Sequence, residues 1–94
     1  MPVLHHLFFG PERSEMWSQF AASLAAGDVV VLLDDAARVA ALIGPLVFTH
    51  GVQILIPEVA MESLNNQSWP AGVARISESD WWSLIETMTL LEWN

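Results

Sequence analysis

Cysteine is absent from this chain of 94 residues. The absence excludes disulfides, thiolate metal sites and a thiol nucleophile. No G-x-G-x-x-G or G-x-x-x-x-G-K-[ST] segment occurs either, so the two common phosphate-binding loops are missing. The sequence therefore predicts no metal and no nucleotide cofactor.

Lysine is absent as well, and three arginines stand against eleven carboxylates, for a net charge of −8. Nucleic-acid binding depends on lysine and arginine side chains that neutralise phosphates, and three scattered arginines cannot form such a surface. An anionic membrane surface would repel the chain for the same reason. We expect no direct contact with nucleic acid or with a membrane.

Long hydrophobic runs are also missing. The longest candidate, Val39–Phe48, is interrupted by Gly44 and Pro45 and spans about ten residues, whereas a membrane-spanning helix needs about 20. The first residues are apolar but lack the basic region and cleavage site of a signal peptide. We expect one cytoplasmic domain that covers residues 1–94.

Apolar residues, by contrast, are abundant, at 53% of the chain. A domain this small has much surface for its volume and cannot bury so many apolar side chains alone. The surplus indicates an exposed apolar surface that another subunit covers.

Strand-like and helix-like segments alternate along the chain, which favours a parallel sheet flanked by helices. Strands are expected at 3–9, 29–33, 52–56 and 73–76. Helices are expected at 12–26, 36–43 and 58–64 and from 78 onward, with Gly27 as the C-cap of the first and Ser77 as the N-cap of the last. Residues 46–50 are ambiguous, and 90–94 are expected to form a short tail. The predicted fold class is α/β, a small (βα)4 domain, Rossmann-like or flavodoxin-like, with a mainly parallel four-stranded sheet.

Histidines and adjacent aspartates provide the candidate chemistry. His5 and His6 are neighbours on a strand and point to opposite faces, so they cannot bind one metal together. A site of one of the three histidines (His5, His6 or His50) with Asp34 or Asp35 is conceivable, because open α/β sheets bind ligands at the carboxyl ends of their strands. We favour the plainer interpretation, in which His5 is a hydrogen-bonded strand histidine and one aspartate caps the next helix.

Five tryptophans need an explanation. Trp17 and Trp81 fall on the apolar faces of their expected helices and are predicted to pack in the core. Trp82 lies about 100° around its helix from Trp81, and Trp93 is almost terminal, so both are candidates for a partner interface. Trp69 is expected in a polar loop, and for this residue packing in the core and a position at an interface are equally expected.

The whole chain resembles the DsrH/TusB family of small subunits of DsrEFH and TusBCD sulfur-relay complexes. Val3–Leu7 resembles the family's opening Leu-His-Thr-Leu strand, with His5 on its histidine and His6 in place of its threonine. Gly27–Ala36 resembles its Gly-Asp element, aliphatic run and Gln-Asp-Gly turn. Ile76–Leu84 is similar to its Ile-Asp-Tyr-x-x-Phe-Val-x-Leu segment, which begins the last helix.

Trp93 also stands where the family closes on a tryptophan. Two features depart from the pattern. Ala36 replaces the family's glycine, and residues 61–66 lack its Arg-Gly turn. These patterns are structural rather than a catalytic signature.

The resemblance implies a hetero-oligomer with cysteine-bearing DsrE/TusD-like and DsrF/TusC-like subunits. Such complexes pass persulfide sulfur toward 2-thiolation of the tRNA wobble uridine, or serve sulfur oxidation. The cysteine of some relatives falls here at about Phe20, so this chain would be a non-catalytic subunit rather than an enzyme. The alternatives are a homo-oligomeric ligand-binding or regulatory domain, and a small enzyme that uses His5, His50 or the aspartates as acid and base.

Overall fold

The computed structural model describes residues 2–43, 51–59 and 72–94. Its strands are β1 (Val3–Leu7), β2 (Val29–Leu32), β3 (Gln53–Pro57), β4 (Val73–Ile76) and β5 (Thr89–Trp93). The described part of the chain also contains α1 (Ser14–Ser23), α2 (Asp34–Arg38) and α5 (Glu78–Thr87). None of the helices found in these residues is long and apolar enough to cross a membrane.

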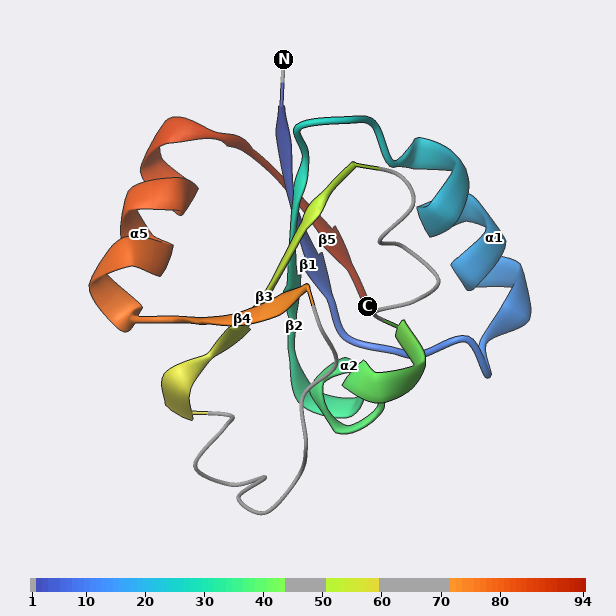
Figure 1. Cartoon of the computed structure of the whole chain (residues 1–94). Helices are drawn as coiled ribbons and strands as arrows, with labels where there is room; N and C mark the ends of the chain where they lie inside the picture. Colours follow the sequence, from blue (N-terminus) through green and yellow to red (C-terminus); the bar gives the residue numbers. More distant parts are fainter. Residues whose placement is uncertain (1, 44–50, 60–71) are drawn as a thin grey trace.

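The five strands form one parallel sheet in the order β4-β3-β2-β1-β5 (Figure 1). The predicted α/β class with a parallel sheet is confirmed. The predicted count of four strands is wrong, because residues 89–93 form a fifth strand instead of a tail. They pair with β1 over its whole length, from Val3 opposite Thr89 to Leu7 opposite Trp93.

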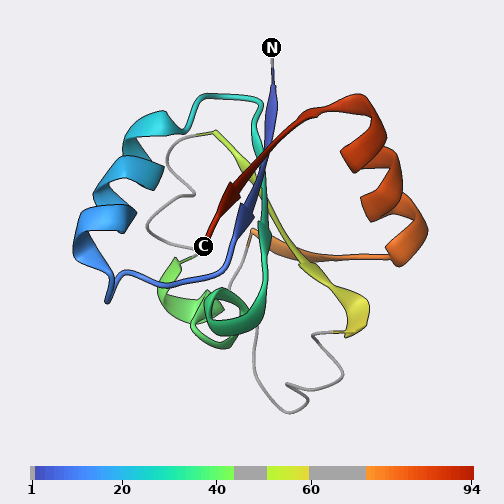
Figure 2. The same cartoon turned by 180° about the vertical axis from the view of Figure 1, so that it is seen from behind.

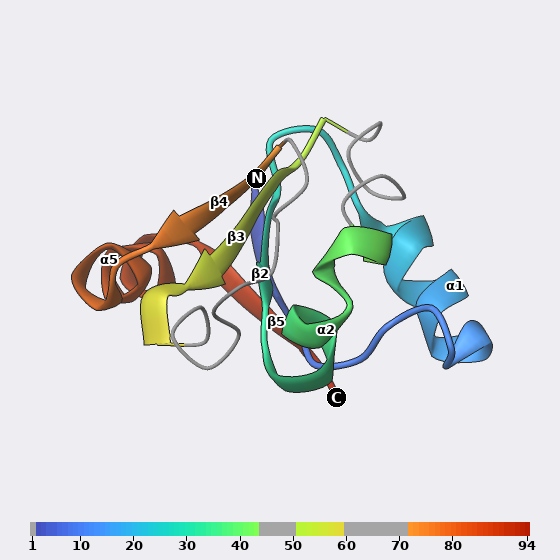
Figure 3. The same ribbon diagram turned by 60° about the horizontal axis from the view of Figure 1, so that its bottom comes forward.

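Helices cover both faces of the sheet. Helix α1 lies over one face and α5 over the other, as the view from behind in Figure 2 and the tilted view in Figure 3 also show. Helix α5 carries the chain from β4 at one edge of the sheet to β5 at the other edge. This crossover explains how the C-terminal segment reaches β1.

Each face of the sheet has its own apolar core. Because side chains alternate along a strand, Leu4 joins the core under α5, whereas Leu7 joins the core under α1. On α1, Phe20 is fully buried, with Met16, Trp17 and Leu24 packed beside it. The predicted apolar face of this helix is confirmed.

The predicted helix ends agree with the structure only in part. Ser77 caps α5 as expected, since its hydroxyl accepts a hydrogen bond from the Asp80 amide at 3.2 Å. Helix α1 is shorter than predicted, because Leu24 is already extended. The prediction that Gly27 is the C-cap of this helix is wrong, because the C-cap is Leu24. Gly27 occupies the turn before β2 instead, with φ of 92°, a conformation that favours glycine.

Some predictions fall on residues outside the described ones. These are most of the helix at 58–64, the ambiguous segment 46–50 with His50, and the loop that carries Trp69.

Candidate functional site

His5 is buried in the middle of β1, on the face that α1 covers, with 1% of its surface exposed. Its Nε2 lies 2.9 Å from Asp28 Oδ2, and its Nδ1 accepts a hydrogen bond from Trp93 Nε1 at 3.1 Å. An indole N–H can only donate, so Nδ1 has no proton and Nε2 donates to Asp28. This assignment makes His5 a neutral imidazole with both nitrogens satisfied.

Asp28 lies just before β2 and completes the network. Its carboxylate accepts hydrogen bonds from the Val3 amide at 2.9 Å and the Ala25 amide at 3.1 Å. Burial raises the pKa of Asp28, but the hydrogen bonds from His5, Val3 and Ala25 outweigh this effect and hold the pKa below its usual value of 3.8. Asp28, His5 and Trp93 therefore tie together the turn before β2, strand β1 and strand β5.

The structure does not bring His5 together with Asp34 or Asp35. His5 lies opposite Val30 and bonds to Asp28 at the beginning of β2, whereas Asp34 follows the end of that strand. Asp28 was not among the predicted site residues, although an aspartate directly before a fully buried strand is a usable signal. Of the two interpretations of His5, the hydrogen-bonded strand histidine is the one observed.

Neither aspartate after β2 caps a helix, which corrects the capping prediction. Leu33 is the N-cap of α2, and the described residues provide no side-chain cap hydrogen bond there. Asp34 is the first helical residue and has φ of 47°, an uncommon conformation for a residue with a side chain. Asp35 is exposed and forms an ion pair with Arg38 at 3.2 Å, which contributes little to stability.

His6 points to the opposite face of the sheet, toward α5. Its Nε2 accepts a hydrogen bond from Trp81 Nε1 at 3.0 Å, and the two rings meet edge to face with centroids 5.5 Å apart. The residue is 6% exposed. Burial lowers the pKa of His6, and the negative charge of Glu92 on β5 opposes this effect only in part.

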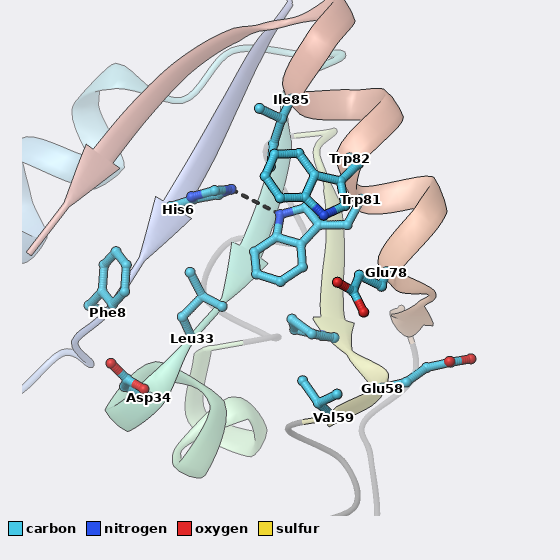
Figure 4. Close-up of a pocket in the computed structure, with 11 residues that line it drawn as sticks. His6, Phe8, Leu33, Asp34, Glu58, Val59, Glu78, Trp81, Trp82 and Ile85 are labelled. Atoms are coloured by element: carbon cyan, nitrogen blue, oxygen red, sulfur yellow. Dashed lines mark hydrogen bonds between the residues drawn. The ribbon is translucent and has the colours of Figure 1, made fainter.

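A cavity of about 640 Å³ opens between the carboxyl ends of the strands and α5 (Figure 4). Most of its wall is apolar. The described residues that line it are His6, Phe8, Leu33, Asp34, Pro57, Glu58, Val59, Glu78, Trp81, Trp82 and Ile85. The volume is within the usual range for ligand pockets, and the carboxyl edge of a parallel sheet is where α/β proteins commonly bind ligands.

The four described tryptophans occupy different environments. Trp17 and Trp81 pack against the two cores, as predicted. Trp82 is 56% exposed at the cavity. Trp93 is partly buried, and its indole packs against His5 and Phe20 rather than projecting freely from the chain end.

Acidification tests the burial of His6. Its pKa is lower in the folded chain than in the unfolded chain, so the unfolded chain binds more protons below pH 6.5. We expect the free energy of unfolding to decrease as the pH falls from 6.5 through the lowered pKa. Urea unfolding at a series of pH values measures this change, and His6→Gln, which keeps a hydrogen-bond acceptor, should show a smaller decrease. An equal decrease in both proteins would show that His6 is not responsible.

No group of three or more histidine, aspartate or glutamate side chains among residues 2–43, 51–59 and 72–94 is placed to hold a metal ion. The chain matches no model of a known protein family, and no curated protein matches it.

Proposed function

We propose that this chain is a non-catalytic, cytoplasmic subunit of a sulfur-relay complex of the DsrEFH or TusBCD kind. It docks on a cysteine-bearing sister subunit and helps to shape the site where that subunit holds persulfide sulfur. The sulfur is destined for tRNA 2-thiolation or for sulfur oxidation.

The environment of Phe20 supports the non-catalytic role. The sequence has no cysteine. The resemblance to DsrH-like chains implies that the position of the cysteine found in some of them falls here at about Phe20. Phe20 is completely buried and packs edge to face against the rings of His5 and Trp93. A fully buried phenyl ring has no group that could hold or transfer sulfur, so the sulfur must reside on another subunit.

The exposure of Trp82 is the main observation that supports docking on a sister subunit. Trp82 and Val59, 56% and 64% exposed, line the same cavity at the carboxyl edge of the sheet. Large exposed apolar side chains are costly in a free subunit, and tryptophan is the residue most often found as an interface anchor. Leu90 and Leu91 on the edge strand β5 add further exposed apolar surface.

Co-expression with DsrE/TusD-like and DsrF/TusC-like subunits tests the proposal. We expect size-exclusion chromatography with light scattering to detect a discrete complex that requires those partners. Trp82→Ala should raise the dissociation constant about thirtyfold, the effect of losing an anchor worth about 2 kcal/mol.

Leu42→Ala is the matched control. Leu42 is 62% exposed but does not line the cavity, so its replacement should leave the complex intact. Equal weakening by both variants would remove the argument for Trp82 as the anchor. A stable monomer or homo-oligomer that ignores the cysteine-bearing partners would contradict the proposal itself.

The cavity also favours a second candidate function, a stand-alone ligand-binding or regulatory domain that self-associates. Its volume and its place beside Asp34 fit a small-molecule site without any partner. This candidate predicts a homo-oligomer of the chain alone, so the chromatography experiment separates the two functions.

A further inference from the structure

The cavity at the carboxyl edge has an acidic mouth. Asp34, Glu58 and Glu78 come from three different connections, after β2, after β3 and at the start of α5. Figure 4 shows Glu78 close to the indoles of Trp81 and Trp82 on the side of α5, Asp34 on the opposite side of the cavity, and the Glu58 carboxylate directed away from the indoles. No lysine or arginine occurs among the described residues that line the cavity.

The described arginines are placed elsewhere. Arg38 pairs with Asp35, and the Arg13 guanidinium lies over the Phe9 ring at 5.0 Å. Arg75 lies on β4 and does not line the cavity. The carboxylates at the mouth are therefore not neutralised by a basic side chain of the cavity wall, and the net charge of −8 adds to the negative field.

The two indoles give the cavity aromatic surface that attracts cations. Trp81 is held in place by its hydrogen bond to His6, so its ring has a fixed orientation beside the cavity. An ammonium or guanidinium group over an indole face is stabilised by about 0.5–2 kcal/mol, the largest such effect among aromatic side chains. Trp82 offers a second, more exposed indole from the next position of the helix.

The remaining wall is apolar and suits a carbon skeleton rather than a bare ion. Phe8, Leu33, Pro57, Val59 and Ile85 contribute it. A hydrated metal ion gains nothing from such a wall, and an organic anion is repelled by the carboxylates.

We propose that this cavity binds a small organic cation, in which an ammonium or amidinium group is attached to an apolar or aromatic body. The apolar body lies against the wall, and the cationic group lies between the indoles and the Glu78 carboxylate, with Asp34 and Glu58 adding to the negative field. The site shares Trp82 and Val59 with the proposed docking surface, so the test uses the isolated chain, in which no sister subunit covers them.

The test compares three probes of nearly equal size on the isolated full chain. They are phenethylammonium, the neutral 2-phenylethanol and the anionic phenylacetate. Indole N–H signals in a ¹⁵N-resolved NMR spectrum report the tryptophans individually. We expect phenethylammonium to shift the Trp81 and Trp82 signals saturably, with a dissociation constant at least about tenfold below those of the other probes.

Two variants and a control locate the effect. Trp82→Ala should weaken phenethylammonium binding about fivefold or more, through loss of one indole. The double variant Glu58→Gln/Glu78→Gln should weaken it severalfold and reduce its salt dependence, whereas Glu86→Gln, on the same helix but outside the cavity, should not. The proposal is overturned if the three probes shift the Trp81 and Trp82 signals equally or not at all, or if Glu86→Gln acts like the double variant.

Discussion

Asp28→Ala is expected to lower the free energy of unfolding by about 3 kcal/mol or more. Asp28 is 2% exposed, and its carboxylate accepts hydrogen bonds from His5 Nε2, the Val3 amide and the Ala25 amide. Alanine removes the acceptor for all three donors. The loss at His5 is the most costly, because that side chain is buried away from water and has no alternative acceptor among the described residues.

Urea unfolding followed by circular dichroism measures this loss at neutral pH. Asp35→Ala is the matched control, since Asp35 is exposed and its replacement should change stability by less than about 0.5 kcal/mol. Asp28→Asn should lower the free energy of unfolding by an amount between those of Asp28→Ala and Asp35→Ala. If Asp28→Ala cost no more than Asp35→Ala, the buried network would not be a source of stability.

Trp93→Ala is expected to lower the free energy of unfolding by about 2–4 kcal/mol. The indole donates to His5 Nδ1, stacks on the His5 ring with centroids 6.4 Å apart and meets Phe20 at 5.8 Å. Alanine removes the aromatic packing and leaves the buried His5 Nδ1 without its donor. It also weakens the attachment of β5 to β1, because Trp93 is the last residue of that edge strand.

Trp93→Phe separates the ring packing of Trp93 from its hydrogen bond, and Trp82→Ala is the control. Phenylalanine keeps ring packing and loses only the N–H, so it should lower the free energy of unfolding less than alanine does. Trp82→Ala removes an exposed side chain and should change the stability of the isolated chain by less than about 0.5 kcal/mol. Unchanged stability in Trp93→Ala would mean that Trp93 does not hold β5 in place, and would leave it as a candidate for the interface alone.

The difference between these tryptophans matters for the interface experiment. Loss of a complex in Trp93→Ala has two explanations, because the variant also weakens the subunit itself. Loss of a complex in Trp82→Ala, with the stability of the subunit unchanged, has one explanation, which is loss of the docking contact. Trp82 is therefore the cleaner probe of docking.

The layered α/β arrangement could be predicted because its signals are local. Val29–Leu32 is a continuous aliphatic run and is buried on both faces of the sheet. The apolar spacing in 14–23 and 78–87 gives the faces by which α1 and α5 pack on the sheet, and Ser77 has the side chain that an N-cap needs. Each of these features depends on neighbours only a few residues away.

Strand β5 could not be predicted in the same way. Residues 89–93 lack a clear alternation of apolar and polar residues, and leucine and glutamate are not strong strand formers. The segment becomes a strand because α5 delivers it to the free edge of β1, about ninety residues away in sequence. The bonds of His5 to Asp28 and Trp93 are equally long-range, with separations of 23 and 88 residues.

The candidate site was predicted in part. Asp34, predicted for a site at the carboxyl edge of the sheet, lines the cavity, and Asp35 does not. Trp82 also lines it, although it was predicted for a partner interface. The histidine there is His6 rather than His5. Alternation showed that the two point to opposite faces, but which face the cavity occupies depends on the path of α5, which the sequence pattern does not reveal.

Co-expression of the chain with the proposed cysteine-bearing subunits, followed by purification and by intact mass spectrometry after exposure to a persulfide donor, tests the central claim most directly. We predict one complex in which the mass of a sister subunit increases by one sulfur atom on its cysteine, while the mass of this chain does not change. A chain that purifies alone, with no stable association with those subunits, would contradict a role in a sulfur relay.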